Sequence, residues 1–108
     1  RILYVDDDEL IADLMLRLLR RAGYTAHVFT SPVEALRAVR DQGLAYDLAI
    51  TDYSMPGMTG IELARALRAL HPRREVAMTT GYISAELRQQ APAAGVSELI
   101  YKPNTGDE

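Results

Sequence analysis

Residues 46–60 read YDLAITDYSMPGMTG. The short apolar run at 48–51 has two β-branched members and is typical of a buried parallel strand. The run stops at a carboxylate, Asp52, and the Pro-Gly pair that follows indicates a loop. Thr59 and Glu62 have the spacing of a capping box, which predicts a helix start. Asp52 is therefore predicted at the carboxyl end of a central strand, either as a simple loop residue or in a ligand site, because open α/β sheets bind ligands at that edge.

Apolar runs and helical patterns alternate along the rest of the chain. Strands are predicted at 2–5, 25–29, 48–51, 75–79 and 98–101, and helices at about 10–22, 32–42, 60–70 and 85–94. This alternation predicts an α/β fold, a doubly wound five-stranded parallel sheet with helices on both faces. Right-handed crossovers favour the flavodoxin-like strand order 2-1-3-4-5, in which the first and third strands are neighbours.

Composition narrows the class of protein. The chain has 108 residues, 48% of them hydrophobic, which suits one small domain with its own core. It has no Cys, which excludes disulfides, thiol chemistry and Cys-ligated metals, and fits a cytoplasmic location. No membrane-length apolar run or signal peptide is visible, and the scattered arginines of a chain with net charge −3 give no nucleic-acid footprint. We therefore expect neither a membrane nor a nucleic acid as partner.

Both ends of the sequence suggest a piece of something longer. The chain begins without Met, directly at a predicted strand, and stops soon after the Lys102-Pro103 pair. We interpret residues 1–108 as a single domain from a longer chain.

Polar side chains follow four of the predicted strands. Asp6 and Asp7 come after the first strand, Asp52 after the third, Thr80 after the fourth and Lys102 after the fifth. Because the first and third strands are neighbours, three carboxylates converge, and a divalent cation would relieve their repulsion. Oxygen ligands alone favour Mg²⁺ or Mn²⁺. A hydroxyl and an ammonium opposite the carboxylates complete a site suited to a transferring phosphoryl group.

Each of these residues also has a simpler interpretation. Asp6 and Asp7 could cap the first helix, Thr80 could be a turn hydroxyl, and Lys102 could be a surface lysine. The agreement of four separate strand ends favours the site. The two histidines, His27 and His71, are assigned no role.

The motifs together resemble a known family. In order along the chain they are Val5-Asp6-Asp7, Asp52, Met55-Pro56-x-Met58-x-Gly60, Thr80-Gly81 and Lys102-Pro103. In this set and spacing, the chain resembles the receiver domain of two-component response regulators and hybrid histidine kinases. The resemblance spans essentially the whole sequence, and it leaves open whether the parent is a single-domain regulator or a hybrid histidine kinase.

The resemblance implies roles for the acidic residues. Asp52 would be the phosphoacceptor that takes a phosphoryl group from a histidine kinase or a histidine phosphotransfer domain. Asp7 would bind Mg²⁺ directly, Asp6 mainly through water, and the backbone carbonyl of Ser54 would be a further metal ligand. Apart from its own phosphorylation and dephosphorylation at Asp52, the domain is not expected to be an enzyme.

The same resemblance assigns the phosphoryl contacts. Thr80 would hydrogen-bond the phosphoryl oxygens, and Lys102 would pair with them. The bond between Lys102 and Pro103 would be cis, a geometry found almost exclusively before proline. Phosphorylation would shift the domain between two states that are read by protein contact.

The sequence departs from the family pattern near its end. Leu99 stands where many members have a switching aromatic residue, Tyr101 lies two positions later, and Asn104 stands where Phe is frequent. The family's fifth helix is expected to be missing or truncated, since the sequence stops at Glu108. An apolar face near the last strand and the first helix would then lack its cover, and a dimer could form through it.

Two other classes of function make different demands on the sequence. A turnover enzyme that uses an aspartyl-phosphate would need a second acid and a lid, but Ser54 stands two positions after Asp52 and no lid insertion is present. A receiver-like interaction module that signals without phosphorylation is the retained alternative, although it would be expected to lack part of the acidic pocket or the lysine.

Overall fold

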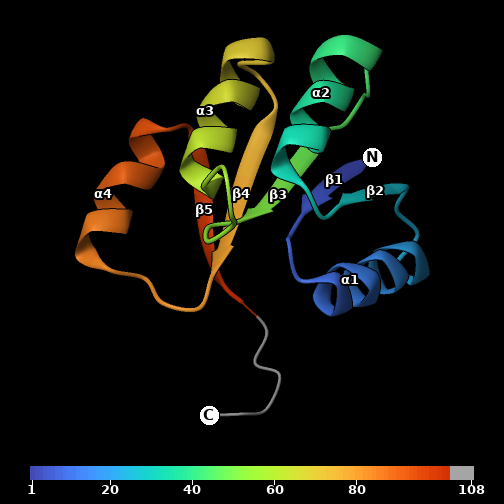
Figure 1. Cartoon of the computed structure of the whole chain (residues 1–108), viewed down its shortest axis with the longest axis horizontal. Coiled ribbons are helices and arrows are strands. Elements are labelled where there is room, and N and C mark those ends of the chain that lie inside the picture. Colours follow the sequence, from blue (N-terminus) through green and yellow to red (C-terminus); the bar gives the residue numbers. More distant parts are fainter. Residues whose placement is uncertain (103–108) are drawn as a thin grey trace.

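The computed structural model describes residues 1–102, in which strands and helices alternate as predicted (Figure 1). The elements are β1 (Ile2–Val5), α1 (Glu9–Arg21), β2 (Ala26–Phe29), α2 (Pro32–Gln42), β3 (Leu48–Asp52), α3 (Gly60–Leu70), β4 (Glu75–Thr80), α4 (Ala85–Ala93) and β5 (Val96–Tyr101). The expectations for Pro103, including its cis bond, for Asn104 and for the segment up to Glu108 lie outside the described residues.

The five strands form one parallel sheet in the order β2-β1-β3-β4-β5, which confirms the flavodoxin-like topology. Strand β3 is central, with Val5 of β1 opposite Thr51 and Thr79 of β4 opposite Asp52. The carboxyl ends of β1, β3 and β4 therefore meet at one edge of the sheet, as the predicted site requires.

The last strand is longer than predicted. It begins at Val96 rather than at residue 98, because Gly95, with φ at 90°, turns the chain directly from α4 into the sheet. The β4–β5 ladder then shifts register at Val76/Ala77, and the hydroxyl of Ser97 donates to the carbonyl of Val76 at 3.2 Å. An irregular start of this kind leaves no alternating sequence pattern from which it could be predicted.

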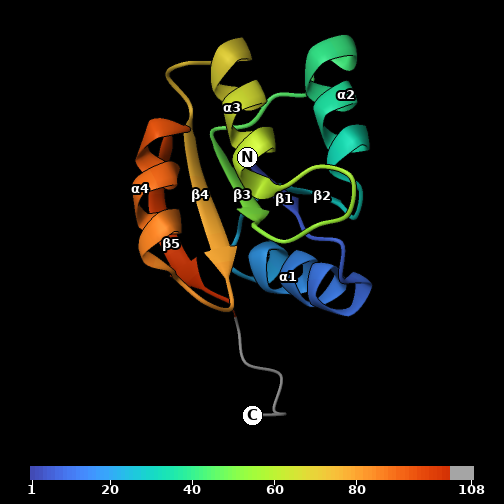
Figure 2. The same ribbon diagram turned by 60° about the vertical axis from the view of Figure 1, so that its left-hand side comes forward.

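The main core lies between the sheet and the three helices α2, α3 and α4. Figure 2 shows α2 and α3 side by side and α4 beside β5. Alternate strand residues point into this layer and meet apolar helix residues; the buried members include Leu3, Val5, Val76, Met78, Ile61, Leu63, Leu67 and Leu87. Strand side chains alternate between faces, so the remaining strand residues face the other side of the sheet.

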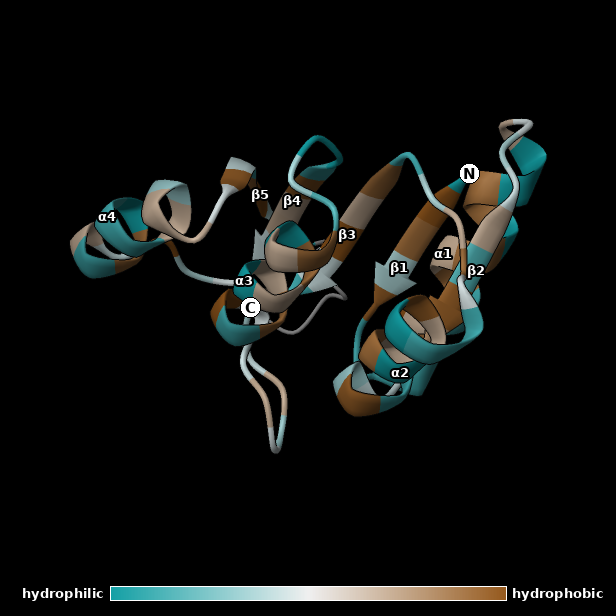
Figure 3. Ribbon diagram, turned by 90° about the horizontal axis from the view of Figure 1, so that it is seen from above, coloured by the Kyte–Doolittle hydropathy of each residue, from teal (hydrophilic) through white to brown (hydrophobic). Residues whose placement is uncertain are grey.

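That opposite face carries one described helix, α1, which lies over β1 and β2 (Figure 3). Among residues 1–102, no helix covers β3, β4 and β5 on this side. Apolar side chains remain open to solvent here and on α1: Ile100 is 38% exposed, and Leu14 and Leu18 are each 46% exposed. Within the described residues, this agrees with the uncovered apolar face expected from the sequence.

Helix α3 begins where the chain returns against the central strand. The predicted capping box is present, with Glu62 N–H donating to Thr59 Oγ1 at 3.2 Å and Thr59 N–H donating to Glu62 Oε1 at 2.9 Å. The N–H of Gly60 donates to the carbonyl of Tyr53 at 2.8 Å. A Cβ at residue 60 would collide with the backbone oxygen of Asp52 and lie 2.9 Å from Tyr53 Cα, so glycine permits this close approach.

Gly60→Ala should therefore destabilise the protein, by about 1–3 kcal/mol, because two backbone segments would have to separate. Urea unfolding measures the difference. Gly81→Ala is the matched control, since nothing lies within 4 Å of a Cβ built at that residue. Equal stability of the two variants would show that the contact between α3 and the end of β3 is not tight.

Candidate functional site

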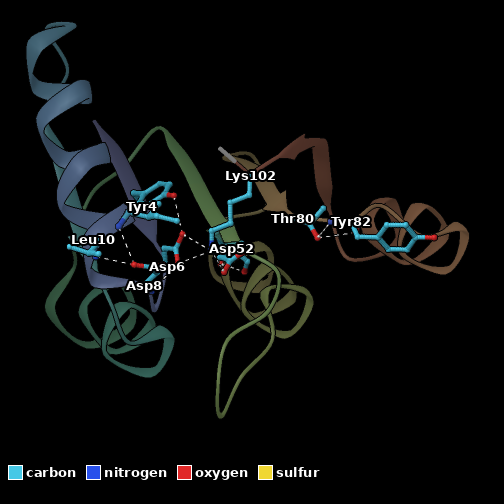
Figure 4. Close-up of polar contacts among 10 residues, drawn as sticks. Tyr4, Asp6, Asp8, Leu10, Asp52, Thr80, Tyr82 and Lys102 are labelled. Atoms are coloured by element: carbon cyan, nitrogen blue, oxygen red, sulfur yellow. Dashed lines mark hydrogen bonds and ion pairs between the residues drawn. The ribbon is translucent and has the colours of Figure 1, made fainter. Parts of the chain in front are cut away.

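Three carboxylates, those of Asp6, Asp7 and Asp52, meet at the carboxyl edge of the sheet. Figure 4 shows two of them, Asp6 and Asp52, beside Lys102. Asp6 follows β1 and is fully buried, Asp52 ends β3 and is 3% exposed, and Asp7 is exposed. One carboxylate oxygen from each residue lies within 4.8 Å of the other two. The predicted convergence of these side chains is therefore present in the structure, and the cluster could hold a metal ion.

Lys102 joins the two buried carboxylates from the far end of the sequence. Its backbone N–H donates to the carbonyl of Thr80 at 2.8 Å, which places it directly beyond β5. Its Nζ donates to Asp52 Oδ2 at 3.0 Å and to Asp6 Oδ1 at 3.3 Å. The side chain is only 21% exposed, so Lys102 is part of the site rather than a surface lysine.

Asp6 is held on both of its oxygens. Its Oδ2 accepts a hydrogen bond from Tyr4 Oη at 3.2 Å, and its Oδ1 accepts one from the N–H of Asp8 at 3.0 Å. Helix α1 is capped by Asp8, whose Oδ1 accepts from the N–H groups of Leu10 at 3.0 Å and Ile11 at 3.3 Å. The capping interpretation therefore applies to Asp8 and leaves Asp6 and Asp7 for the cluster.

Thr80 lies at this edge but makes local contacts. It is 5% exposed, and its Oγ1 donates to the carbonyl of Tyr82 at 3.0 Å and accepts from the N–H of Tyr82 at 3.3 Å. These are the contacts of a turn hydroxyl, and among the described residues Thr80 Oγ1 has no hydrogen bond to Asp52 or Lys102. Ser54 is exposed in the loop that follows β3, and its role as a metal ligand stays a prediction.

Tyr4 is a site residue that the sequence analysis missed, because it was counted only as an apolar member of the first strand. The available signal was its position two residues before Asp6, which puts both side chains on one face of the strand. A tyrosine in the interior usually finds a hydrogen-bond partner for its hydroxyl. Asp6 is that partner.

Burial and neighbouring charges shift the pKa values of Asp52, Lys102 and Tyr4. Burial raises the pKa of Asp52, the hydrogen bond from Lys102 opposes this, and the charge of Asp6 adds to it. Burial lowers the pKa of Lys102, but its hydrogen bond to Asp52 and the charges of both carboxylates outweigh burial and raise it overall. Burial and then Asp6 raise the pKa of Tyr4, so its hydroxyl remains a donor. Lys102 therefore remains an ammonium beside the carboxyl groups of Asp6 and Asp52.

The donor set fits a small divalent cation. Asp6, Asp7 and Asp52 present carboxylate oxygens on one side, and hard cations such as Mg²⁺ prefer oxygen ligands. The excess of negative charge over the single Lys102 ammonium favours cation entry. Asp7, which is exposed, offers the oxygen nearest to solvent for an entering ion.

Asp52→Asn should stabilise the protein at neutral pH in Mg²⁺-free buffer, because Asn keeps the shape and still accepts a hydrogen bond from Lys102. The folded-state pKa of Asp52 lies above the unfolded one, so its contribution to stability is favourable at acid pH and is lost as pH rises through the folded-state pKa. Thermal melts across pH should show the largest gain near neutrality and convergence of the two proteins in acid. A variant that is less stable at neutral pH would contradict this electrostatic account.

Comparison with known proteins places the chain in a family. The family model for the response regulator receiver domain matches residues 2–108. The chain is 32% identical over 102 residues to Sensor kinase CckA of Brucella abortus, covering 94% of this chain and 11% of that protein. A CheY-like receiver domain structure from Methanospirillum hungatei superposes with a TM-score of 0.89 at 33% identity, covering 97% of this chain and 82% of that one.

A further solved structure bears on the acidic cluster. It is a response regulator protein from Burkholderia pseudomallei with a phosphorylated aspartic acid, a calcium ion and citrate, and it is similar at a TM-score of 0.86 and 27% identity. The match covers 96% of this chain and 60% of that one. From the fold, the cluster and the family match, the chain belongs to the response regulator receiver domains of two-component signalling.

Proposed function

We propose that this receiver domain is a phosphoacceptor in a two-component phosphorelay, with Asp52 as the residue that takes the phosphoryl group. The observation that carries the proposal is the placement of Asp52 at the end of the central strand, buried beside Asp6 and joined to Lys102 at 3.0 Å. The Burkholderia relative, with its phosphorylated aspartic acid and calcium ion, supports the same chemistry in a similar fold.

The proposed step is a transfer from a phosphohistidine donor. A carboxylate oxygen of Asp52 attacks phosphorus, the P–N bond of the donor breaks, and the imidazole leaves with the electron pair of that bond. A bound Mg²⁺ would neutralise charge on the phosphoryl oxygens. Asp6, Asp7, Asp52 and the carbonyl of Ser54 are its proposed ligands, with Mn²⁺ as a substitute. Lys102 would move its ammonium from the carboxylate to a phosphoryl oxygen.

Thr80 would link phosphorylation of Asp52 to a change at the surface of the domain. Its hydroxyl must release the backbone of Tyr82 before it can donate to a phosphoryl oxygen. Tyr82 is 76% exposed at the start of the segment that leads to α4, so this exchange would alter the surface of the domain. Leu99 is packed against the core, and this local route requires no switching aromatic at its position.

The proposed phosphoryl donor is inferred from the family. Receiver domains take phosphate from histidine kinases, and a histidine kinase or a histidine phosphotransfer domain is the proposed partner. The chain spans 11% of the length of CckA. Among residues 1–102, no helix has the length and the apolar character that a membrane span needs.

We further propose a dimer that forms through the open face of β3–β5, because the apolar side chain of Ile100 is exposed on that face.

Incubation with acetyl phosphate should add one phosphoryl group in the presence of Mg²⁺ and none after Mg²⁺ is chelated. Intact-protein mass spectrometry measures the adduct. Asp52→Asn should abolish it, because the nucleophilic oxygen is lost, whereas Asp13→Asn, a change to an exposed carboxylate on α1, should leave it unchanged. A wild-type protein that forms no adduct would favour an interaction module that signals without phosphorylation.

A further inference from the structure

Tyr4 lies directly behind the acidic cluster. It is in the middle of β1, 1% exposed, and its hydroxyl points to Asp6 on the same strand face (Figure 4). The hydrogen bond from Tyr4 Oη to Asp6 Oδ2 is 3.2 Å long and wholly buried. Both partners are inaccessible to water, so neither group has solvent as a substitute partner.

This hydrogen bond fixes a carboxylate that is otherwise held mainly from one side. Asp6 Oδ1 accepts from the N–H of Asp8 at 3.0 Å and from Lys102 Nζ at 3.3 Å. At Oδ2 the contacts are Tyr4 Oη at 3.2 Å and the same Lys102 Nζ at 3.3 Å. Tyr4 thus adds to Oδ2 a second contact besides that of Lys102, and this contact limits the rotation of the carboxylate.

We propose that Tyr4 is a positioning residue of the cation site, which holds Asp6 in the orientation that serves a divalent cation. The inference rests on the proposed function, since it assumes that the cluster binds Mg²⁺. Donors that orient a metal-binding group typically change metal affinity 10- to 100-fold when they are removed. Without Tyr4 Oη, Asp6 Oδ2 would keep its contact to Lys102, and the carboxylate would be freer to rotate out of the orientation that serves the cation.

Tyr46 offers a matched control for the loss of a single buried hydroxyl. It is also 1% exposed, and its ring packs edge-on to His71 with the centroids 5.9 Å apart and lies under the Arg74 guanidinium at 5.0 Å. Its hydroxyl is buried and has no hydrogen-bond partner among the described residues. Tyr46→Phe therefore removes the same atom as Tyr4→Phe without removing a contact to the cluster.

The test is a calorimetric titration with Mg²⁺ alone on wild type and both variants. Tyr4→Phe should weaken Mg²⁺ binding by about tenfold, and Tyr46→Phe should bind as wild type does. Phe keeps the ring that fills each site, and circular dichroism verifies that both variants fold. With acetyl phosphate, the Mg²⁺ concentration for half-maximal phosphorylation should rise in Tyr4→Phe, while the rate at saturating Mg²⁺ returns close to the wild-type rate.

Each other outcome would overturn the positioning role of Tyr4. Unchanged or tighter Mg²⁺ binding by folded Tyr4→Phe would overturn the positioning role and leave the proposed function intact. An equal loss in Tyr46→Phe would assign the effect to the core in general and would also overturn it. A wild-type protein that binds no Mg²⁺ would remove the metal step of the proposed function, and this inference with it.

Discussion

Two carboxylates buried side by side are the constraint on which this structure depends. Asp6 is fully buried and Asp52 is 3% exposed, and like charges at close range in a poorly solvated site repel one another. Lys102 offsets part of this repulsion with contacts of 3.0 Å and 3.3 Å, although it lies 96 residues from Asp6 in sequence. The parallel sheet order is what brings these distant residues to one edge. The remaining excess of negative charge makes this edge of the sheet suitable for binding a cation.

Short-range contacts in the surrounding structure hold the two buried carboxylates in place despite their repulsion. Asp8 caps α1 and donates its own N–H to Asp6, so the first helix and the cluster share one residue. Gly60 lets α3 begin against the backbone of Asp52, which fixes the loop that carries Ser54. Thr80 is held by two hydrogen bonds to the backbone of Tyr82, two residues along the chain.

Much of the fold and of the site could be predicted from the sequence, because the signals are local. Apolar runs, caps and turn residues gave the element order, and Asp6, Asp7, Asp52 and Lys102 converge as their strand-end positions predicted. Three-dimensional detail could not be predicted in the same way. The spacing of Tyr4 and Asp6 places both side chains on one face, but the hydrogen bond between them depends on the burial of both groups. The contact between Thr80 and Tyr82 depends on the rotamer of Thr80, which the sequence spacing does not determine. The start of β5 depends on a register shift in the β4–β5 ladder.

The most direct test of this account is a titration of the Asp52 carboxyl group by ¹³C NMR, with and without saturating Mg²⁺. In Mg²⁺-free buffer the pKa of Asp52 should lie above the ordinary range for aspartate, because burial and Asp6 oppose ionisation more than Lys102 favours it. Mg²⁺ should lower that pKa, because a bound cation stabilises the ionised form. A pKa that Mg²⁺ leaves unchanged would contradict the claim that this carboxylate cluster is a cation site built around the phosphoacceptor.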